Sequence, residues 1–163
     1  MLILGIDPGY AIVGWGVVNY DKGRFTPVAF GSIRTEAGLP VETRLAQIHK
    51  SLVAIIDAYH PDVMSIEELF WNTNQKTGIV VAEARGIILL SATEAGVPIF
   101  EYTPLQVKQA IVGYGRAEKK QVIMMVTNIL KLKNPPKPDD TADALGLAIC
   151  HAHYASSPLS SLM

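Results

Sequence analysis

The spacing of apolar residues changes from a strand-like to a helical pattern near residue 40, and this change restricts the possible folds more than any other feature. Residues 2–6, 11–20 and 24–34 form three apolar runs, separated by the turn signals Pro8-Gly9 and Asp21-Lys22-Gly23. Short turns between consecutive strands favour an antiparallel meander. The first part of the chain is therefore expected to form three adjacent strands of one sheet.

Helical and strand-like segments alternate after this meander, and Gly and Pro residues mark several of the boundaries. The sequence predicts helices over residues 45–59, 79–95, 104–112, 118–132 and from residue 139 onward, strands over residues 63–66 and 97–102, and loops over residues 69–77 and 134–138. Such an order implies an α/β fold, a five-stranded mixed sheet with helices on both faces. We expect one domain over residues 1–155, followed by a short disordered tail, 156–163.

Positive charge is concentrated in one segment, although the net charge of the chain is only −1. Residues 108–137 contain seven of the 14 basic residues and one acid, Glu118. Three acids, Asp139, Asp140 and Asp143, follow directly. A basic surface beside an acidic cluster suits a metal-dependent enzyme that acts on a polyanion, whereas a simple solvated helix face explains the lysines equally well on charge alone.

The chain carries no sign of a membrane span, because charged residues or His interrupt its apolar runs. Met1 is followed directly by a strand-like run with no basic segment before it, so we expect a cytoplasmic protein. The single cysteine, Cys150, lies in an apolar helical pattern and is expected to be a buried core thiol.

Four carboxylates occupy positions that a purely structural role would not favour. Asp7 and Glu67 each end an apolar strand, and Asp140 and Asp143 lie three residues apart at the start of the last helix. If the first and fourth strands are neighbours, the four groups meet, and their repulsion requires a cation. Hard oxygen ligands suit Mg²⁺, with Mn²⁺ as a substitute, and two such ions can drive phosphodiester hydrolysis.

Each acid also has a structural explanation. Asp7 can open the Pro-Gly turn, Glu68 competes with Glu67 as the inward carboxylate, and Asp139 is a natural N-cap of the last helix. Asp140 and Asp143 can compensate the helix dipole. Their order along the predicted topology, more than any single position, favours a catalytic cluster.

The motifs that carry these acids resemble those of the RuvC crossover junction endodeoxyribonucleases, which have a ribonuclease H-like fold. The similarity runs from about residue 2 to residue 154, and the matching segments are Ile3-Leu4-Gly5-Ile6-Asp7-Pro8-Gly9, Ile66-Glu67 with Leu69-Phe70, Phe100-Glu101-Tyr102 with Gln106-Val107-Lys108-Gln109, Ala117-Glu118-Lys119, and Asp140-Thr141-Ala142-Asp143-Ala144-Leu145.

The resemblance implies a homodimer that resolves four-way Holliday junctions by paired symmetric nicks in recombination and DNA repair, together with the RuvA and RuvB branch-migration proteins. The four catalytic acids of the family then fall on Asp7, Glu67, Asp140 and Asp143. Some members carry His as the third acid, and the neighbouring Asp139 leaves open which Asp serves here. Lys108 and Lys119 correspond to lysines that contact the junction, and Phe70 to an aromatic that stacks on an unpaired base.

A two-fold symmetric junction suits a two-fold symmetric enzyme. The predicted helix from Ile79 to Leu90 is apolar around much of its surface, and we therefore expect it to form the dimer interface. Phe70 and Trp71 lie in a polar loop, where an exposed ring can stack on a base or fold back onto the core.

Other classes of protein fit less well. A sugar-kinase-like ATPase also opens with an Asp-x-Gly turn, but the chain is short for two lobes and has no GxxxxGK[ST] loop. A non-catalytic junction-binding module would not need all four acids. A ribonuclease H-like nuclease acting on RNA or a hybrid remains open, since substrate choice depends on groove contacts. The His and Cys residues form no zinc pattern.

Overall fold

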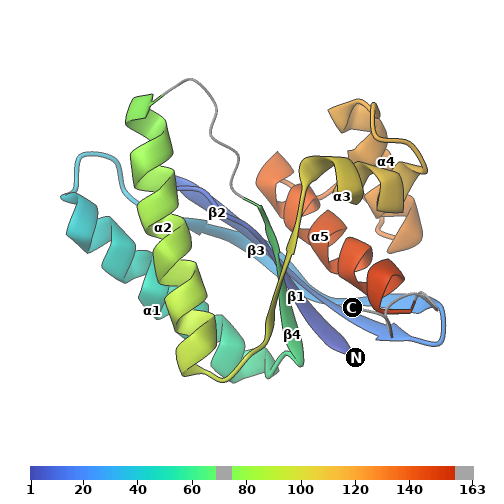
Figure 1. The fold of residues 1–163 in the computed structure, drawn as a ribbon, viewed down its shortest axis with the longest axis horizontal. Coiled ribbons are helices and arrows are strands. Elements are labelled where there is room, and N and C mark those ends of the chain that lie inside the picture. The colour runs from blue at the N-terminus through green and yellow to red at the C-terminus, as the bar shows by residue number, and fades with distance from the viewer. Residues whose placement is uncertain (69–74, 157–163) are drawn as a thin grey trace.

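The computed structural model describes residues 1–68 and 75–156 of the 163-residue chain. Five strands and five helices follow one another in the predicted order (Figure 1). Their bounds are β1 Leu2–Asp7, β2 Ile12–Asp21, β3 Arg24–Arg34, α1 Val41–Tyr59, β4 Val63–Glu67, α2 Gln75–Glu94, β5 Ile99–Tyr102, α3 Pro104–Val112, α4 Lys119–Ile129 and α5 Asp139–Ala155.

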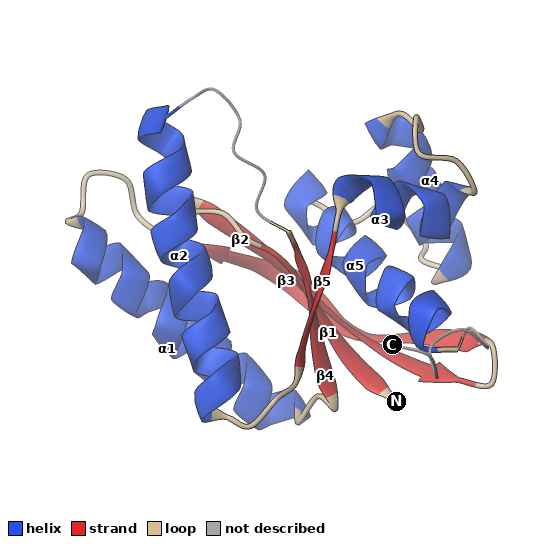
Figure 2. Cartoon of the chain, viewed as in Figure 1, coloured by secondary structure: helices blue, strands red, loops and turns tan. Residues whose placement is uncertain are grey.

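The strands form one mixed sheet in the order β3-β2-β1-β4-β5 (Figure 2). β1, β2 and β3 pair antiparallel, so the predicted meander is confirmed. The turn between β2 and β3 uses positive φ angles at Lys22 (46°) and Gly23 (83°), as two-residue hairpins require. β4 joins β1 in parallel, and β5 joins β4 in parallel, because α1 and α2 provide the crossovers.

Helices cover both faces of this sheet, as the sequence predicted. α1 and α2 lie on one face, and α3, α4 and α5 lie on the other (Figure 1). Alternate residues of β1 separate the two layers of the core: Leu4 and Ile6 pack toward α1 and α2, whereas Ile3 packs toward α5. By the same alternation, Gly5 and Asp7 belong to the α5 face.

α5 is the central helix of its layer, and nearly all of its residues from Thr141 to Ala152 are buried. Its expected inward residues Ala142, Leu145 and Ile149 are all fully buried. The predicted core thiol Cys150 is buried too, and burial raises its pKa to about 12. In the described ranges 1–68 and 75–156, no helix is long and apolar enough to cross a membrane.

Two local predictions were wrong. α2 begins at Gln75, so residues 75–77 belong to a helix and not to the expected loop. The error arose because apolar periodicity marks only the packed part of a helix and not its full length. Asp139 is not the N-cap of α5: Pro138 occupies that position, no side chain caps the helix, and Asp139 is the first helical residue. As expected, Thr103 is the N-cap of α3 and Pro104 is its first residue, and Thr103 forms a complete capping box with Gln106.

Candidate active site

Asp7 and Glu67 come together because β1 and β4 are parallel neighbours. Ile6 pairs with Ile66, so each acid is the next residue along its strand at the same edge of the sheet. Ser65 donates a hydrogen bond of 2.7 Å to the Leu147 carbonyl of α5, which shows that this face of β4 is turned toward α5. By strand alternation, both carboxylates lie on the α5 side.

Glycines bring the start of α5 against these strands. Gly14 is the partner of Asp7 in the β1–β2 ladder, and a Cβ at this position would collide with the backbone carbonyl of Asp140. Gly5 allows the same close approach one turn further along, against the Ala144 carbonyl. Thr141 adds a hydrogen bond of 3.1 Å to the Gly31 carbonyl of β3. The backbone of α5 therefore rests directly on the sheet beside Asp7.

The charges of the other three acids act on Asp7. Burial, followed by the negative charges of Asp143, Glu67 and Asp140, raises the pKa of Asp7 from 3.8 to about 8, and Lys119 offsets part of this effect. A carboxyl group with so high a pKa lacks the water or positive charge that would stabilise its ionised form. The site therefore favours the binding of a cation.

Glu67 and Asp143 show the same deficit. Burial and the charge of Asp143 raise the pKa of Glu67, although Lys108 and Lys119 oppose the shift. Burial also raises the pKa of Asp143, despite its hydrogen bond to Lys119. Glu68, the alternative to Glu67, is exposed.

Lys119, at the first position of α4, is the cation nearest to these acids. Its Nζ lies 3.0 Å from Asp143 Oδ2 and 3.7 Å from Asp139 Oδ2. Partial burial lowers the pKa of the Lys119 ammonium, but the hydrogen bond and charge of Asp143 outweigh it and raise the pKa overall. Lys119 is therefore a permanent positive charge at the edge of the acidic cluster, and Lys108 acts on Glu67 from α3.

The donor set suits a hard divalent cation, since it consists of carboxylate oxygens in a half-buried site with a deficit of positive charge. Within residues 1–68 and 75–156, no three Asp, Glu, His or Cys side chains converge into a ready-made metal cage. The four acids are coupled by charge, and Lys119 pairs with two of the acids at the start of α5.

The structure brings Asp7, Glu67, Asp140 and Asp143 together, with Lys108 and Lys119 beside them. Asp139 is more peripheral: its side chain is exposed, and its Oδ2 lies 3.7 Å from Lys119 Nζ. Phe70 and Trp71 lie outside the described residues. Sequence reasoning missed Gly14, against which the start of α5 packs, and Arg85, which donates a hydrogen bond to the Glu67 carbonyl. Gly14 within an apolar strand was the available signal.

The mixed sheet in the order β3-β2-β1-β4-β5, with helices on both faces, is that of the ribonuclease H-like class of nucleases. Residues 3–151 match the family described as crossover junction endodeoxyribonuclease RuvC. The chain therefore belongs to the RuvC family of crossover junction endodeoxyribonucleases, as the resemblance of its motifs implied.

Close relatives match almost the whole chain. The crossover junction endodeoxyribonuclease RuvC of Brevibacillus brevis is 57% identical over 154 residues, which cover 94% of this chain and 93% of the relative. The protein of the same description from Caldanaerobacter subterraneus is 55% identical over 153 residues, covering 94% and 93%.

Solved structures agree in the fold. T. thermophilus RuvC in complex with a Holliday junction substrate superposes with a TM-score of 0.90 at 37% identity, and the match covers 95% of this chain and 94% of that one. The yeast mitochondrial Holliday junction resolvase is 12% identical with a TM-score of 0.68, covering 93% and 78%, so it shares the fold.

Proposed function

We propose that this protein resolves four-way Holliday junctions by paired symmetric nicks, using Asp7, Glu67, Asp140 and Asp143 to bind the catalytic metal. The observation that carries this proposal is the convergence of four acids where β1 and β4 end and α5 begins; burial and mutual repulsion there raise the pKa of Asp7 to about 8. Family membership supports the substrate, because T. thermophilus RuvC is described in complex with a Holliday junction.

The carboxylates at the ends of β1 and β4 and at the start of α5 would hold Mg²⁺, or Mn²⁺ in its place, with two ions in each site. When bound, the ions supply an activated water and stabilise the leaving oxygen of the phosphodiester. The chain itself fixes the positions of the four acids. The backbone of α5 packs directly against Gly14 of β2, and most of α5 is buried in the core. Asp139 is a weaker candidate for the third acid than Asp140, because it is exposed.

The lysines beside the cluster would bind the DNA backbone. Lys119 and Lys108 are close enough to act on Glu67, so a phosphate brought to the acids also meets their ammonium groups. Such contacts attract DNA without reading its sequence, and they weaken as salt increases. Phe70, which lies outside the described residues, is proposed to stack on an unpaired base at the junction centre.

A homodimer would place two such sites on opposite strands of the junction. α2 buries one face, including Ala84 and Ile88, in the core, yet leaves Ile79 55% and Leu90 49% exposed. Exposed large apolar side chains on an otherwise packed helix suit contact with a second copy. RuvA and RuvB, the branch-migration proteins, are the partners proposed from the family resemblance.

A cleavage assay tests the proposal directly. Purified protein is incubated with a labelled four-way junction and with a linear duplex of equal length, in Mg²⁺, in Mn²⁺ or in chelator. We expect paired nicks in the junction only, abolished by chelator and in Asp7→Asn, while junction binding persists. Glu67→Gln should behave like Asp7→Asn, whereas the adjacent control Glu68→Gln, which removes an exposed charge, should cut normally.

Two other outcomes would assign a different function. Binding of the junction without cutting in either metal would indicate a junction-binding module. Equal cutting of junction and duplex, or preferential cutting of an RNA–DNA hybrid, would keep the metal site but reject the junction-specific activity.

A further inference from the structure

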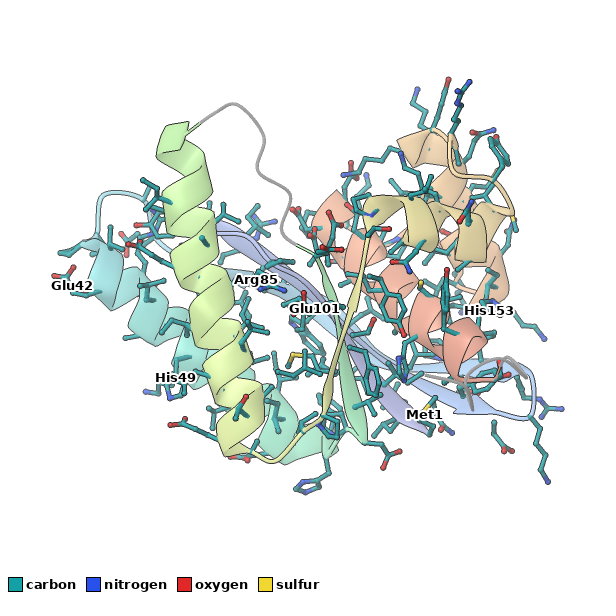
Figure 3. The ribbon with its side chains drawn as sticks, in the orientation of Figure 1. Met1, Glu42, His49, Arg85, Glu101 and His153 are labelled. Atoms are coloured by element: carbon teal, nitrogen blue, oxygen red, sulfur yellow. The ribbon has the colours of Figure 1, made fainter. Side chains whose placement is uncertain are left out.

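We propose that Arg85 and Glu101 form a brace that positions Glu67 for metal binding, and that Arg85 is therefore a positioning residue of the nuclease. The inference rests on the proposed function of Glu67. Arg85 lies on α2 and Glu101 on β5, and Figure 3 shows the two side chains directed toward each other in front of the sheet.

The Arg85 guanidinium contacts two partners. Arg85 Nη2 lies 2.8 Å from Glu101 Oε2, and Arg85 Nε donates a hydrogen bond of 3.4 Å to the backbone carbonyl of Glu67. One guanidinium thus reaches both a neighbouring strand and the residue that carries the catalytic carboxylate. A planar group whose donors lie on three nitrogens can make these two contacts at once, whereas the three donors of a lysine ammonium all lie on one nitrogen at the end of a flexible chain.

β5 holds the other side of the same strand end. Glu101 is the register partner of Ile66, and Tyr102 is the partner of Glu67. The amide of Glu68 donates a hydrogen bond of 2.9 Å to the Tyr102 carbonyl, directly after Glu67. The end of β4 is therefore fixed by β5 through the backbone and by α2 through Arg85.

Burial of the Arg85 side chain distinguishes this brace from an ordinary surface ion pair. The Arg85 side chain is only 13% exposed, whereas that of Glu101 is 48% exposed. Because water screens the Glu101 carboxylate, the ion pair itself adds little to the stability of the fold. Nη2 is buried and its contact with Glu101 lacks the alignment of a hydrogen bond. A buried guanidinium needs a counter-charge, and Glu101 supplies it at the place where Arg85 also meets Glu67.

The brace also links the active site to α2. Ala84, adjacent to Arg85 in sequence, is fully buried in the core layer between α2 and the sheet. A displacement of α2 would therefore be transmitted through Arg85 to the backbone of Glu67. If α2 forms the dimer interface, the same residue connects each interface to its own catalytic acid.

The test compares Arg85→Met, Arg85→Lys and Glu101→Gln with the wild-type protein. Asp57→Asn is the control, because it removes an exposed charge from α1, which covers the same face of the sheet as α2. Three quantities are measured: the single-turnover cleavage rate of a synthetic junction, junction affinity in chelator, and Mn²⁺ affinity of the DNA-free protein from the free-Mn²⁺ resonance signal.

We expect Arg85→Met to lower the cleavage rate roughly 10- to 100-fold, as a small misplacement of a catalytic group does, with junction affinity changed by less than about twofold. Mn²⁺ affinity should fall several-fold in the same variant, and Arg85→Lys should recover only part of either loss. Glu101→Gln should show a smaller loss of both quantities, and Asp57→Asn none.

A loss of junction affinity with an unchanged cleavage rate would make Arg85 a DNA contact and overturn the proposal. Wild-type Mn²⁺ affinity in both Arg85→Met and Glu101→Gln would overturn it as well. If Arg85→Met fails to fold, the half-exposed Glu101→Gln decides the question. If the wild-type protein cuts no junction, the proposed function fails, but the Mn²⁺ comparison still tests the brace.

Discussion

Replacing Gly14 with alanine should separate the two halves of the active site. The new Cβ would collide with backbone atoms of Asp140 and Thr141, which cannot rotate away as the end of a side chain could. Relief requires α5 to move away from β2 by on the order of 1 Å, the shift that restores ordinary van der Waals separation. Asp140 and Asp143 would move with it, away from Asp7 and Glu67.

Two magnitudes follow from this displacement. Overpacking of a tight core contact costs about 1–3 kcal/mol, which corresponds to a fall in Tm of roughly 2–4 °C per kcal/mol for a chain of this size. Misplacement of catalytic groups by about 1 Å reduces the rate of the chemical step on the order of 100-fold. The rate loss should therefore be large in a protein that is still folded at 25 °C.

Gly16→Ala is the matched control for this substitution. Gly16 lies on the same strand, and a Cβ there would meet mainly the side chain of Leu145 and not the backbone at the start of α5. We expect a comparable fall in Tm but a cleavage rate within a few-fold of wild type, measured under single-turnover conditions. Equal rates for wild type and Gly14→Ala, or equal rate losses in both variants, would refute the argument that Gly14 sets the approach of Asp140.

Three further predictions concern other parts of the molecule. Because the pKa of Asp7 is raised in the folded, metal-free protein, ionisation of Asp7 opposes folding. In thermal unfolding, the stability of the metal-free protein should therefore fall as pH rises from about 4 to about 8. Mg²⁺ should raise the Tm more at pH 8 than at pH 5. The fall measured in chelator should be smaller in Asp7→Asn, and an equal fall in the two proteins would contradict the assignment. Leu90→Glu should convert dimers to monomers in sedimentation velocity, and unchanged dimers would remove α2 from the interface. Cys150, buried and with a pKa raised to about 12, should react with a thiol reagent only on unfolding; rapid modification of the native protein would show that the α5 layer opens.

The acids of β1 and β4 could be predicted from the sequence because strand patterns report on local geometry. An apolar run that ends in a carboxylate fixes both the end of the strand and, through alternation, the face on which the acid lies. Glu67 and Glu68 illustrate this well, since alternation favoured Glu67 and the structure leaves Glu68 exposed. Predicting the five-stranded mixed sheet required only the order of the elements.

The contacts that hold the site together could not be predicted in this way. The approach of Gly14 to the Asp140 carbonyl joins residues 126 positions apart, and no periodicity along the chain reports it. Arg85 and Glu101 meet across two elements whose packing is set by the core. The cap of α5 was assigned to Asp139 on residue preference alone, but the helix begins one residue earlier than that preference implies, and Asp139 contacts Lys119 instead.

The burial of α5 has a consequence for how the protein tolerates change. Two of the four proposed metal ligands stand at the start of the most enclosed helix of the fold, and neither can drift without disturbing the packing behind it. Segments of this kind release their amide protons only when the whole domain unfolds. In the wild-type protein, spontaneous fluctuations that displace these two acids therefore require the core to open, so selection for cleavage also maintains the core.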